Sequence, residues 1–115
     1  MILVVDDSEF MRETVTAALS IFNYEAMSAS DGLDALKKYE SGEFELIITD
    51  INMPELDGIG LIKEIRKKNQ DIPIIVLTTE SEDDIKTEAL EIGADGWLVK
   101  PFQPPQLLSM IRELL

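Results

Sequence analysis

The sequence contains neither cysteine nor histidine. Without cysteine the chain can form no disulfide, no thiolate zinc site and no cysteine nucleophile, which is compatible with a reducing compartment. Without histidine it has no histidine-based triad, no imidazole base and no imidazole metal ligand. Any chemistry must therefore come from carboxylates, hydroxyls, amines and the backbone.

Basic residues and long apolar runs are also scarce. The 10 Lys and Arg stand against 23 Asp and Glu, for a formal net charge of −13, which disfavours nucleic acid and anionic membrane as direct partners. The longest apolar runs are about five residues, far below the roughly 20 that span a bilayer. Met1 leads directly into an apolar run without the basic segment and cleavage site of a signal peptide. We therefore expect a cytoplasmic protein without a membrane partner.

Short apolar segments alternate with segments of helical spacing along the chain. We expect strands at residues 2–5, 26–29, 46–49, 74–77 and 97–99, which mostly lack polar alternation, as strands buried on both faces do. Between them, apolar residues recur at helical intervals, as at Met11, Val15 and Leu19. Five β–α units without a linker predict one α/β domain over residues 1–115, with a parallel sheet flanked by five helices.

Helix-boundary residues agree with this division of the chain. Ser8 suits the start of the first helix, and Ser81 with Asp84 three residues later resembles a capping box for the fourth. Gly93 falls where a left-handed residue would end that fourth helix. Pro104 supplies a fixed dihedral for entering the last helix. Helix boundaries are therefore expected at these positions.

Polar side chains follow the strands at their carboxyl ends, where ligands bind in parallel sheets. Asp6 and Asp7 follow the first strand, Asp50 ends the third, Thr78 ends the fourth and Lys100 follows the fifth. Taken singly, each has an ordinary explanation as a helix cap, a loop start, a strand end or a solvated charge. Together they predict one site, whose crowded carboxylates are relieved by protonation or by a bound cation. An all-oxygen donor set favours Mg²⁺ as that cation.

Five motifs follow one another along the chain: VVDDS at 4–8, TDINMP at 49–54 with DG at 57–58, LT at 77–78, GADGW at 93–97 and KPF at 100–102. With these motifs the chain resembles, over its whole length, the receiver domain of two-component response regulators. The segment at 101–104 is most similar to single-domain receivers of the chemotaxis type. The resemblance implies a flavodoxin-like fold with strand order 2-1-3-4-5 and a phosphorylation-activated signalling switch.

The resemblance implies a role for each acidic residue of the predicted site. Asp50 would be the phosphoacceptor, a nucleophile toward a phosphohistidine or a small phosphodonor. Asp6 and Asp7 would hold Mg²⁺ together with Asp50, and the backbone carbonyl of Asn52 would supply another ligand. These roles make chemical sense, because phosphoryl transfer through a loose transition state needs positioning and charge neutralisation more than covalent help.

The resemblance also implies how the signal would leave the site. Lys100 would pair with one phosphoryl oxygen and the Thr78 hydroxyl with another, and the bond between Lys100 and Pro101 would be cis. Trp97 occupies the aromatic switch position, and its ring would turn inward. The face formed by the fourth helix, fifth strand and fifth helix would then change shape and bind a downstream protein. The phosphoryl donor would be a sensor histidine kinase or a phosphotransfer protein, and no separate substrate would be turned over.

Several alternatives remain beside this interpretation. A degenerate receiver acting as a constitutive interaction module is disfavoured, because no acceptor, metal or lysine position is missing. The chain would equally suit the receiver part of a longer regulator with a separate output domain. An aspartyl-nucleophile phosphatase would carry an Asp-x-Asp motif where this sequence has Asp6-Asp7-Ser8. A flavin carrier would need a Ser-, Thr- and Gly-rich phosphate loop at the same place.

Overall fold

A computed structural model describes residues 1–115 as strands and helices in strict alternation. The strands are β1 (Ile2–Val5), β2 (Ala26–Ala29), β3 (Leu46–Thr49), β4 (Ile74–Thr78) and β5 (Gly96–Val99). The helices are α1 (Glu9–Ile21), α2 (Gly32–Ser41), α3 (Gly58–Lys68), α4 (Asp83–Glu91) and α5 (Pro104–Leu114). None of these helices combines the length and the apolar character that a membrane crossing requires.

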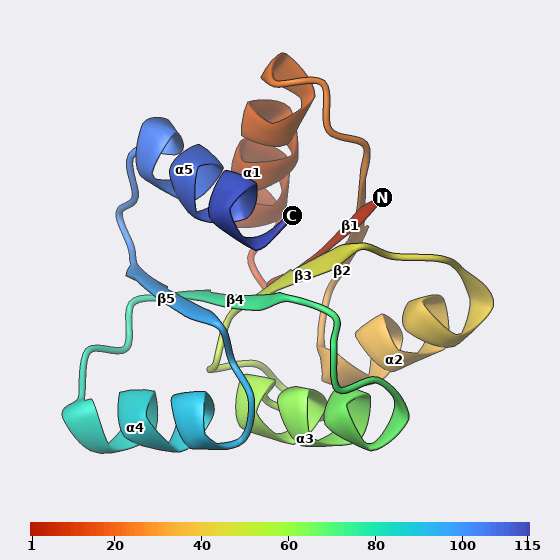
Figure 1. Cartoon of the computed structure of the whole chain (residues 1–115), viewed down its shortest axis with the longest axis vertical. Coiled ribbons are helices and arrows are strands. Elements are labelled where there is room, and N and C mark those ends of the chain that lie inside the picture. The colour runs from red at the N-terminus through yellow and green to blue at the C-terminus, as the bar shows by residue number, and fades with distance from the viewer.

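The strands form one parallel sheet in the order β2-β1-β3-β4-β5, which confirms the predicted fold class and strand order. Helices α1 and α5 cover one face of the sheet, and α2, α3 and α4 cover the other (Figure 1). The chain order reverses around β1 and β3, whose last residues Val5 and Thr49 are paired. Asp6 and Asp50 therefore leave the sheet side by side, at the point where ligands bind in open α/β sheets.

Two apolar clusters, one on each face of the sheet, hold the strand ends in place. β1, β3 and β4 are buried along their whole length, because helices cover both of their faces. Each fully buried Ile, Leu or Val side chain stabilises the fold by about 1.5–3 kcal/mol relative to exposure. The tightly packed central strands give fixed positions to the residues that follow them.

Two strands are one residue longer than the apolar runs that predict them, and Thr78 ends β4 as expected. Thr78 belongs to β4, where it pairs with Val99, and Gly96 belongs to β5, where it pairs with Ile75. The apolar runs exclude both residues, because threonine carries a hydroxyl group and glycine has no side chain. Parallel pairing depends on the backbone, which these residues supply as well as any other.

Three of the predicted helix boundaries are confirmed. The Ser8 hydroxyl accepts the backbone N–H of Met11 at 3.3 Å and so caps α1. Pro104 is the first residue of α5. Gly93 follows the end of α4 with a φ of +118°, a conformation in which any side chain would be strained.

The predicted capping box at the start of α4 is wrong. The helix begins at Asp83 after Glu82, and no side chain caps it. Instead, the Glu80 carboxylate accepts the N–H of Glu82 at 3.1 Å, and this hydrogen bond lies in the loop before the helix. Ser81 therefore lies before the helix cap, and Asp84 lies in the first helical turn.

Candidate functional site

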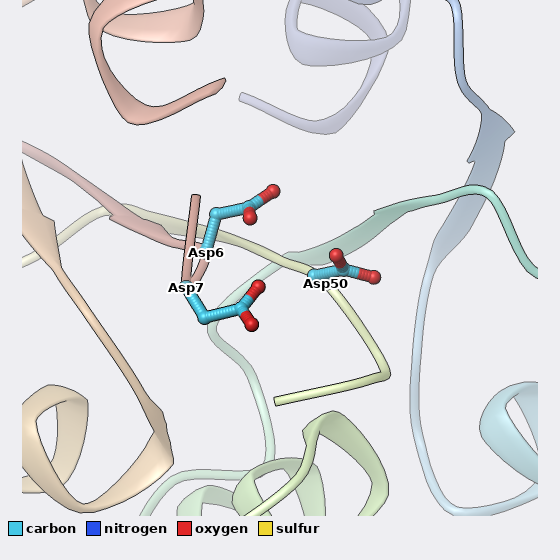
Figure 2. Close-up of side chains that lie close together, drawn as sticks. All are labelled: Asp6, Asp7 and Asp50. Carbon is cyan, nitrogen blue, oxygen red and sulfur yellow. The ribbon is translucent and has the colours of Figure 1, made fainter. Parts of the chain in front are cut away.

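Three carboxylates meet at the carboxyl ends of β1 and β3. Asp6 and Asp7 follow β1, Asp50 follows β3, and one oxygen from each lies within 4.8 Å of the others (Figure 2). Asp6 and Asp50 are buried, whereas Asp7 is exposed to solvent. Like charges at this separation repel one another, and a nearby cation relieves the repulsion. The structure therefore brings the three predicted acidic residues into one cluster that attracts positive charge.

Lys100 supplies one such charge from within the chain. Its Nζ donates to Asp6 Oδ2 at 2.6 Å and to Asp50 Oδ2 at 3.0 Å, and its side chain is only 10% exposed. Burial disfavours the charged amine, but hydrogen bonds and attraction from the two carboxylates outweigh it and raise the pKa of Lys100 above its ordinary value. The amine is thus protonated at neutral pH. The Lys100–Pro101 peptide bond is cis.

Backbone N–H groups hold the remaining oxygens of the two buried carboxylates. Asp6 Oδ1 accepts the N–H of Ser8 at 2.9 Å, and Asp50 Oδ1 accepts the N–H of Ile51 at 2.6 Å. Each carboxylate therefore has one oxygen on the backbone and the other on Lys100. Such charge-assisted hydrogen bonds are short and strong, so both side chains are held in a single orientation.

Thr78 lies at the same edge of the sheet, but its hydroxyl makes no hydrogen bond to the carboxylates. The side chain is fully buried at the end of β4 and accepts the N–H of Glu80 at 3.1 Å. The backbone carbonyl of Thr78 accepts the N–H of Lys100 at 2.7 Å. The structure thus joins Thr78 to Lys100 through the backbone and leaves its hydroxyl bonded to the loop that precedes α4.

Trp97 lies on the edge strand β5, three residues before Lys100. It pairs with Val76 of β4, and its half-buried side chain packs against the apolar cluster on the sheet face that α2, α3 and α4 cover. The ring is therefore packed on the side of the sheet where α4 lies.

The donor set of the cluster fits Mg²⁺. Asp6, Asp7 and Asp50 offer only oxygen, the ligand that this hard cation prefers, and the exposure of Asp7 leaves room for the waters that Mg²⁺ retains. Asn52 lies two residues after Asp50, and its backbone carbonyl accepts no hydrogen bond within the chain. That carbonyl is free to act as the further ligand that the family resemblance implies.

Three residues that hold the backbone of the cluster have no role predicted from the sequence. Arg12 Nη1 donates to the Asp6 carbonyl at 2.8 Å, and the Thr49 hydroxyl donates to the Asp50 carbonyl at 2.8 Å. A Cβ on Gly58 would lie 2.2 Å from the same Asp50 carbonyl oxygen. Two signals were available, since Arg12 is the one basic residue of α1 and Thr49 the one polar residue of β3.

Comparisons with known proteins show the family of this chain. The family model described as the response regulator receiver domain matches residues 2–112. The probable transcriptional regulator ycf27 of Porphyridium aerugineum is 42% identical over 114 residues, which cover 99% of this chain and 47% of that protein. The alkaline phosphatase synthesis transcriptional regulatory protein PhoP of Bacillus subtilis (strain 168) is 39% identical over 114 residues, with coverages of 99% and 48%. The chain spans about half the length of these curated relatives.

Solved structures of receiver proteins match nearly the whole of this chain. The chemotaxis protein CheY4 of Vibrio cholerae matches with a TM-score of 0.94 at 40% identity, covering 99% of this chain and 97% of that chain. The receiver domain of a signal transduction histidine kinase from Syntrophus aciditrophicus matches with a TM-score of 0.91 at 32% identity, with coverages of 99% and 88%. The similarity is therefore one of sequence as well as of fold.

Proposed function

The chain belongs to the response regulator receiver family, and we propose that its Asp50 accepts a phosphoryl group from a histidine kinase or phosphotransfer protein in a Mg²⁺-dependent reaction. As a receiver domain it is a signalling switch. The observation that carries the proposal is the convergence of Asp6, Asp7 and Asp50 at one sheet edge, with the Lys100 amine between two of them.

The reaction is an in-line displacement at phosphorus. An oxygen of the ionised Asp50 carboxylate attacks the phosphorus of a phosphohistidine, an O–P bond forms and the P–N bond breaks. The electron pair of that bond returns to the imidazole nitrogen, which takes up a proton from solvent. Lys100, 3.0 Å from Asp50 Oδ2, then donates to a phosphoryl oxygen of the acyl phosphate. Attack of water on the phosphorus later restores the carboxylate and ends the signal.

The other residues of the cluster prepare Asp50 for this step. Asp6, Asp7, Asp50 and the Asn52 carbonyl would hold Mg²⁺, which when bound supplies charge neutralisation for the phosphoryl oxygens. The N–H of Ile51 fixes one oxygen of Asp50 at 2.6 Å. Fixing the acceptor oxygen in this way speeds phosphoryl transfer, because the reaction depends on positioning and needs little covalent help from the protein.

Thr78 transmits the change away from the acceptor. Phosphorylation adds about −1.5 to −2 charges and three acceptor oxygens at Asp50. The Thr78 hydroxyl exchanges the N–H of Glu80 for a phosphoryl oxygen, to which it donates. The Trp97 ring then turns into the space beside the displaced hydroxyl, and the adjoining surface is rearranged.

That surface consists of α4, β5 and α5, and we name it the output face. It carries exposed apolar side chains at Leu90 and Val99. Beside α5 lies a shallow, open depression, which Leu98 and Met110 line together with polar residues such as Gln106 and Glu113. Exposed apolar area of this kind suits a protein partner. The net charge of −13 disfavours nucleic acid as a direct ligand of the domain.

Intact mass after incubation with acetyl phosphate tests the proposal. The wild-type protein is incubated with Mg²⁺ or with EDTA, and Asp50→Asn is treated in the same way. One added phosphoryl group that requires Mg²⁺ and is absent from Asp50→Asn is the expected result. If neither an adduct nor a beryllofluoride complex forms, the phosphoacceptor function is wrong and the constitutive interaction module replaces it.

A second candidate function concerns the context of the domain. The relatives named as transcriptional regulators are about twice as long as this chain. In such a protein the output face would control a second domain of the same chain rather than a separate partner. Gel filtration of the 115-residue chain with and without beryllofluoride separates self-association of the domain from a response that needs other partners.

A further inference from the structure

The Thr49 side chain makes an unusual contact within the buried core. Thr49 is the one polar residue of β3 and is completely inaccessible to solvent. Its hydroxyl donates to the backbone carbonyl of the next residue, Asp50, at 2.8 Å. No backbone N–H reaches that carbonyl, so the hydroxyl is its one hydrogen-bond donor within the chain.

The carbonyl that Thr49 holds belongs to the same peptide unit as the N–H that holds the Asp50 carboxylate. Thr49 binds the C=O end of the peptide between Asp50 and Ile51, and the N–H end donates to Asp50 Oδ1 at 2.6 Å. A peptide unit is planar and rigid, so fixing its carbonyl also fixes the direction of its N–H. Thr49 and the carboxylate oxygen are thus linked through one rigid group.

Gly58, at the start of α3, also restricts the movement of this peptide. A Cβ at this position would lie 2.2 Å from the Asp50 carbonyl oxygen, so any side chain at the start of α3 would clash with the peptide. The N–H of Gly58 donates to the Ile51 carbonyl at 2.8 Å. With the carbonyl held between Thr49 and α3, the peptide unit has little freedom to rotate.

We propose that Thr49 is a positioning residue for the phosphoryl acceptor. Its hydroxyl orients the 50–51 peptide, whose N–H holds Asp50 Oδ1 and thereby leaves Oδ2 directed at Lys100. This inference rests on the proposed function, in which Asp50 is the nucleophile. Loss of the hydroxyl leaves a buried carbonyl without a donor, and the peptide turns to find one. The carboxylate then loses the orientation that in-line attack requires.

Substitutions that separate the hydroxyl from the rest of the Thr49 side chain test the proposal. Thr49→Val keeps the shape and removes the hydroxyl, whereas Thr49→Ser keeps the hydroxyl. Thr14→Val is the matched control, because the Thr14 hydroxyl also donates to a backbone carbonyl, that of Phe10 at 2.8 Å, but on α1. The first readout is the amide proton shift of Ile51 in the metal-free protein. The second is the initial rate of phosphorylation by acetyl phosphate with Mg²⁺.

The expected result is a change in both readouts that follows the hydroxyl. Thr49→Val moves the Ile51 amide proton upfield, because its hydrogen bond to Asp50 Oδ1 lengthens, and slows phosphorylation about tenfold. Thr49→Ser retains the wild-type shift and a rate near that of the wild type. Thr14→Val changes neither. A merely structural role of Thr49 would lower the unfolding temperature without this pattern.

Opposite results overturn the inference and distinguish it from the proposed function. An unchanged Ile51 shift and rate in folded Thr49→Val overturns the role of Thr49 while Asp50 remains the acceptor. If Thr49→Val does not fold, Thr49→Ser is compared with Thr49→Ala, and equal shifts and rates for these two overturn it likewise. Absence of any adduct or beryllofluoride complex on the wild-type protein overturns the proposed function itself, and the positioning role of Thr49 with it.

Discussion

The acceptor edge, at the ends of β1 and β3, is held more firmly than α4 and β5 of the output face, whereas the third element of that face, α5, buries three residues. β3 is buried throughout, and α3 beside it buries four residues and is capped by Asp57, whose carboxylate accepts the N–H of Gly60 at 2.8 Å. On the output face β5 is partly exposed, and α4 buries only Ala89 and has no side-chain cap. Elements with few buried contacts open at the lowest free energy.

This difference assigns separate mechanical roles to the two regions. Phosphoryl transfer needs a nucleophile with a fixed orientation, whereas a switch needs an element that moves for a few kcal/mol. The far end of α4 is anchored, because Arg66 donates to the Gly93 carbonyl at 2.7 Å and to Asp95 Oδ2 at 3.1 Å. Movement of α4 is therefore expected at the end that follows Thr78.

Replacing the Lys100 amine, which joins two carboxylates, should destabilise the acceptor edge most strongly. Lys100→Met leaves Asp6 and Asp50 buried without their cation, and we expect the free energy of unfolding to fall by about 3–5 kcal/mol. Mg²⁺ should restore part of the loss, because it binds the same carboxylates. Urea denaturation with and without Mg²⁺ measures both effects.

Lys86→Met is the control for that substitution. Lys86 is exposed on α4 and forms no ion pair, so its loss should change the stability by less than about 0.5 kcal/mol. A loss below about 1 kcal/mol in Lys100→Met would contradict the view that the amine is needed to hold the buried carboxylates together.

Adding a methyl group next to the Asp50 peptide should also destabilise the acceptor edge. Gly58→Ala places a Cβ 2.2 Å from the Asp50 carbonyl oxygen, and overpacking of this kind costs about 1–3 kcal/mol. The phosphorylation rate should fall too, because the acceptor peptide is displaced. Gly60→Ala is the control, since its Cβ would meet mainly the movable end of the Leu56 side chain. Equal rates and stabilities for the two variants would rule out a tight approach at Gly58.

Removing the Thr78 hydroxyl should uncouple the two regions without stopping the chemistry. Thr78→Val leaves the N–H of Glu80 without its acceptor, at a cost of about 1 kcal/mol, and a phosphoryl group should still be added to Asp50. The emission of Trp97, the one tryptophan of the chain, should no longer change on adding beryllofluoride and Mg²⁺. Thr87→Val on the exposed side of α4 serves as control. An emission change that survives in Thr78→Val would disprove this route.

A carboxylate outside both regions should give the smallest effect. Burial raises the pKa of Asp34, but hydrogen bonds from the Ser30 N–H and from Lys38 outweigh it, and the pKa lies below its ordinary value of 3.8. The stabilisation is therefore present above pH 3.8 and is lost as the pH falls through the folded-state pKa. Asp34→Asn should be slightly less stable than wild type near neutral pH, and the difference should shrink as the pH is lowered below 3.8, by thermal melting. A difference that persists at the lower pH would contradict this.

The sequence alone predicts the residues of the site but not the order of the strands. The cluster of Asp6, Asp7, Asp50 and Lys100 follows from strand ends alone, because parallel strands present their carboxyl ends at one edge. The strand order came only from the family resemblance, since short buried strands do not reveal their neighbours.

Contacts that depend on the folded geometry could not be predicted. The capping box at Ser81 fits the local pattern, yet Glu80 closes the loop before α4 instead. Arg12 stands out as the one basic residue of α1 and Thr49 as the one polar residue of β3, but the backbone carbonyl that each one contacts carries no sequence signal. Local patterns thus locate the charged groups, while the groups that orient them become visible only in the fold.

Amide hydrogen exchange of the wild-type protein, with and without beryllofluoride and Mg²⁺, tests the division between a fixed acceptor edge and a movable output face most directly. We predict that amides of β1 and β3 exchange slowly in both states, and that the ligand changes exchange chiefly in the loop after β4, in α4 and in β5. A change spread evenly over the sheet, or one confined to β1 and β3, would contradict the account.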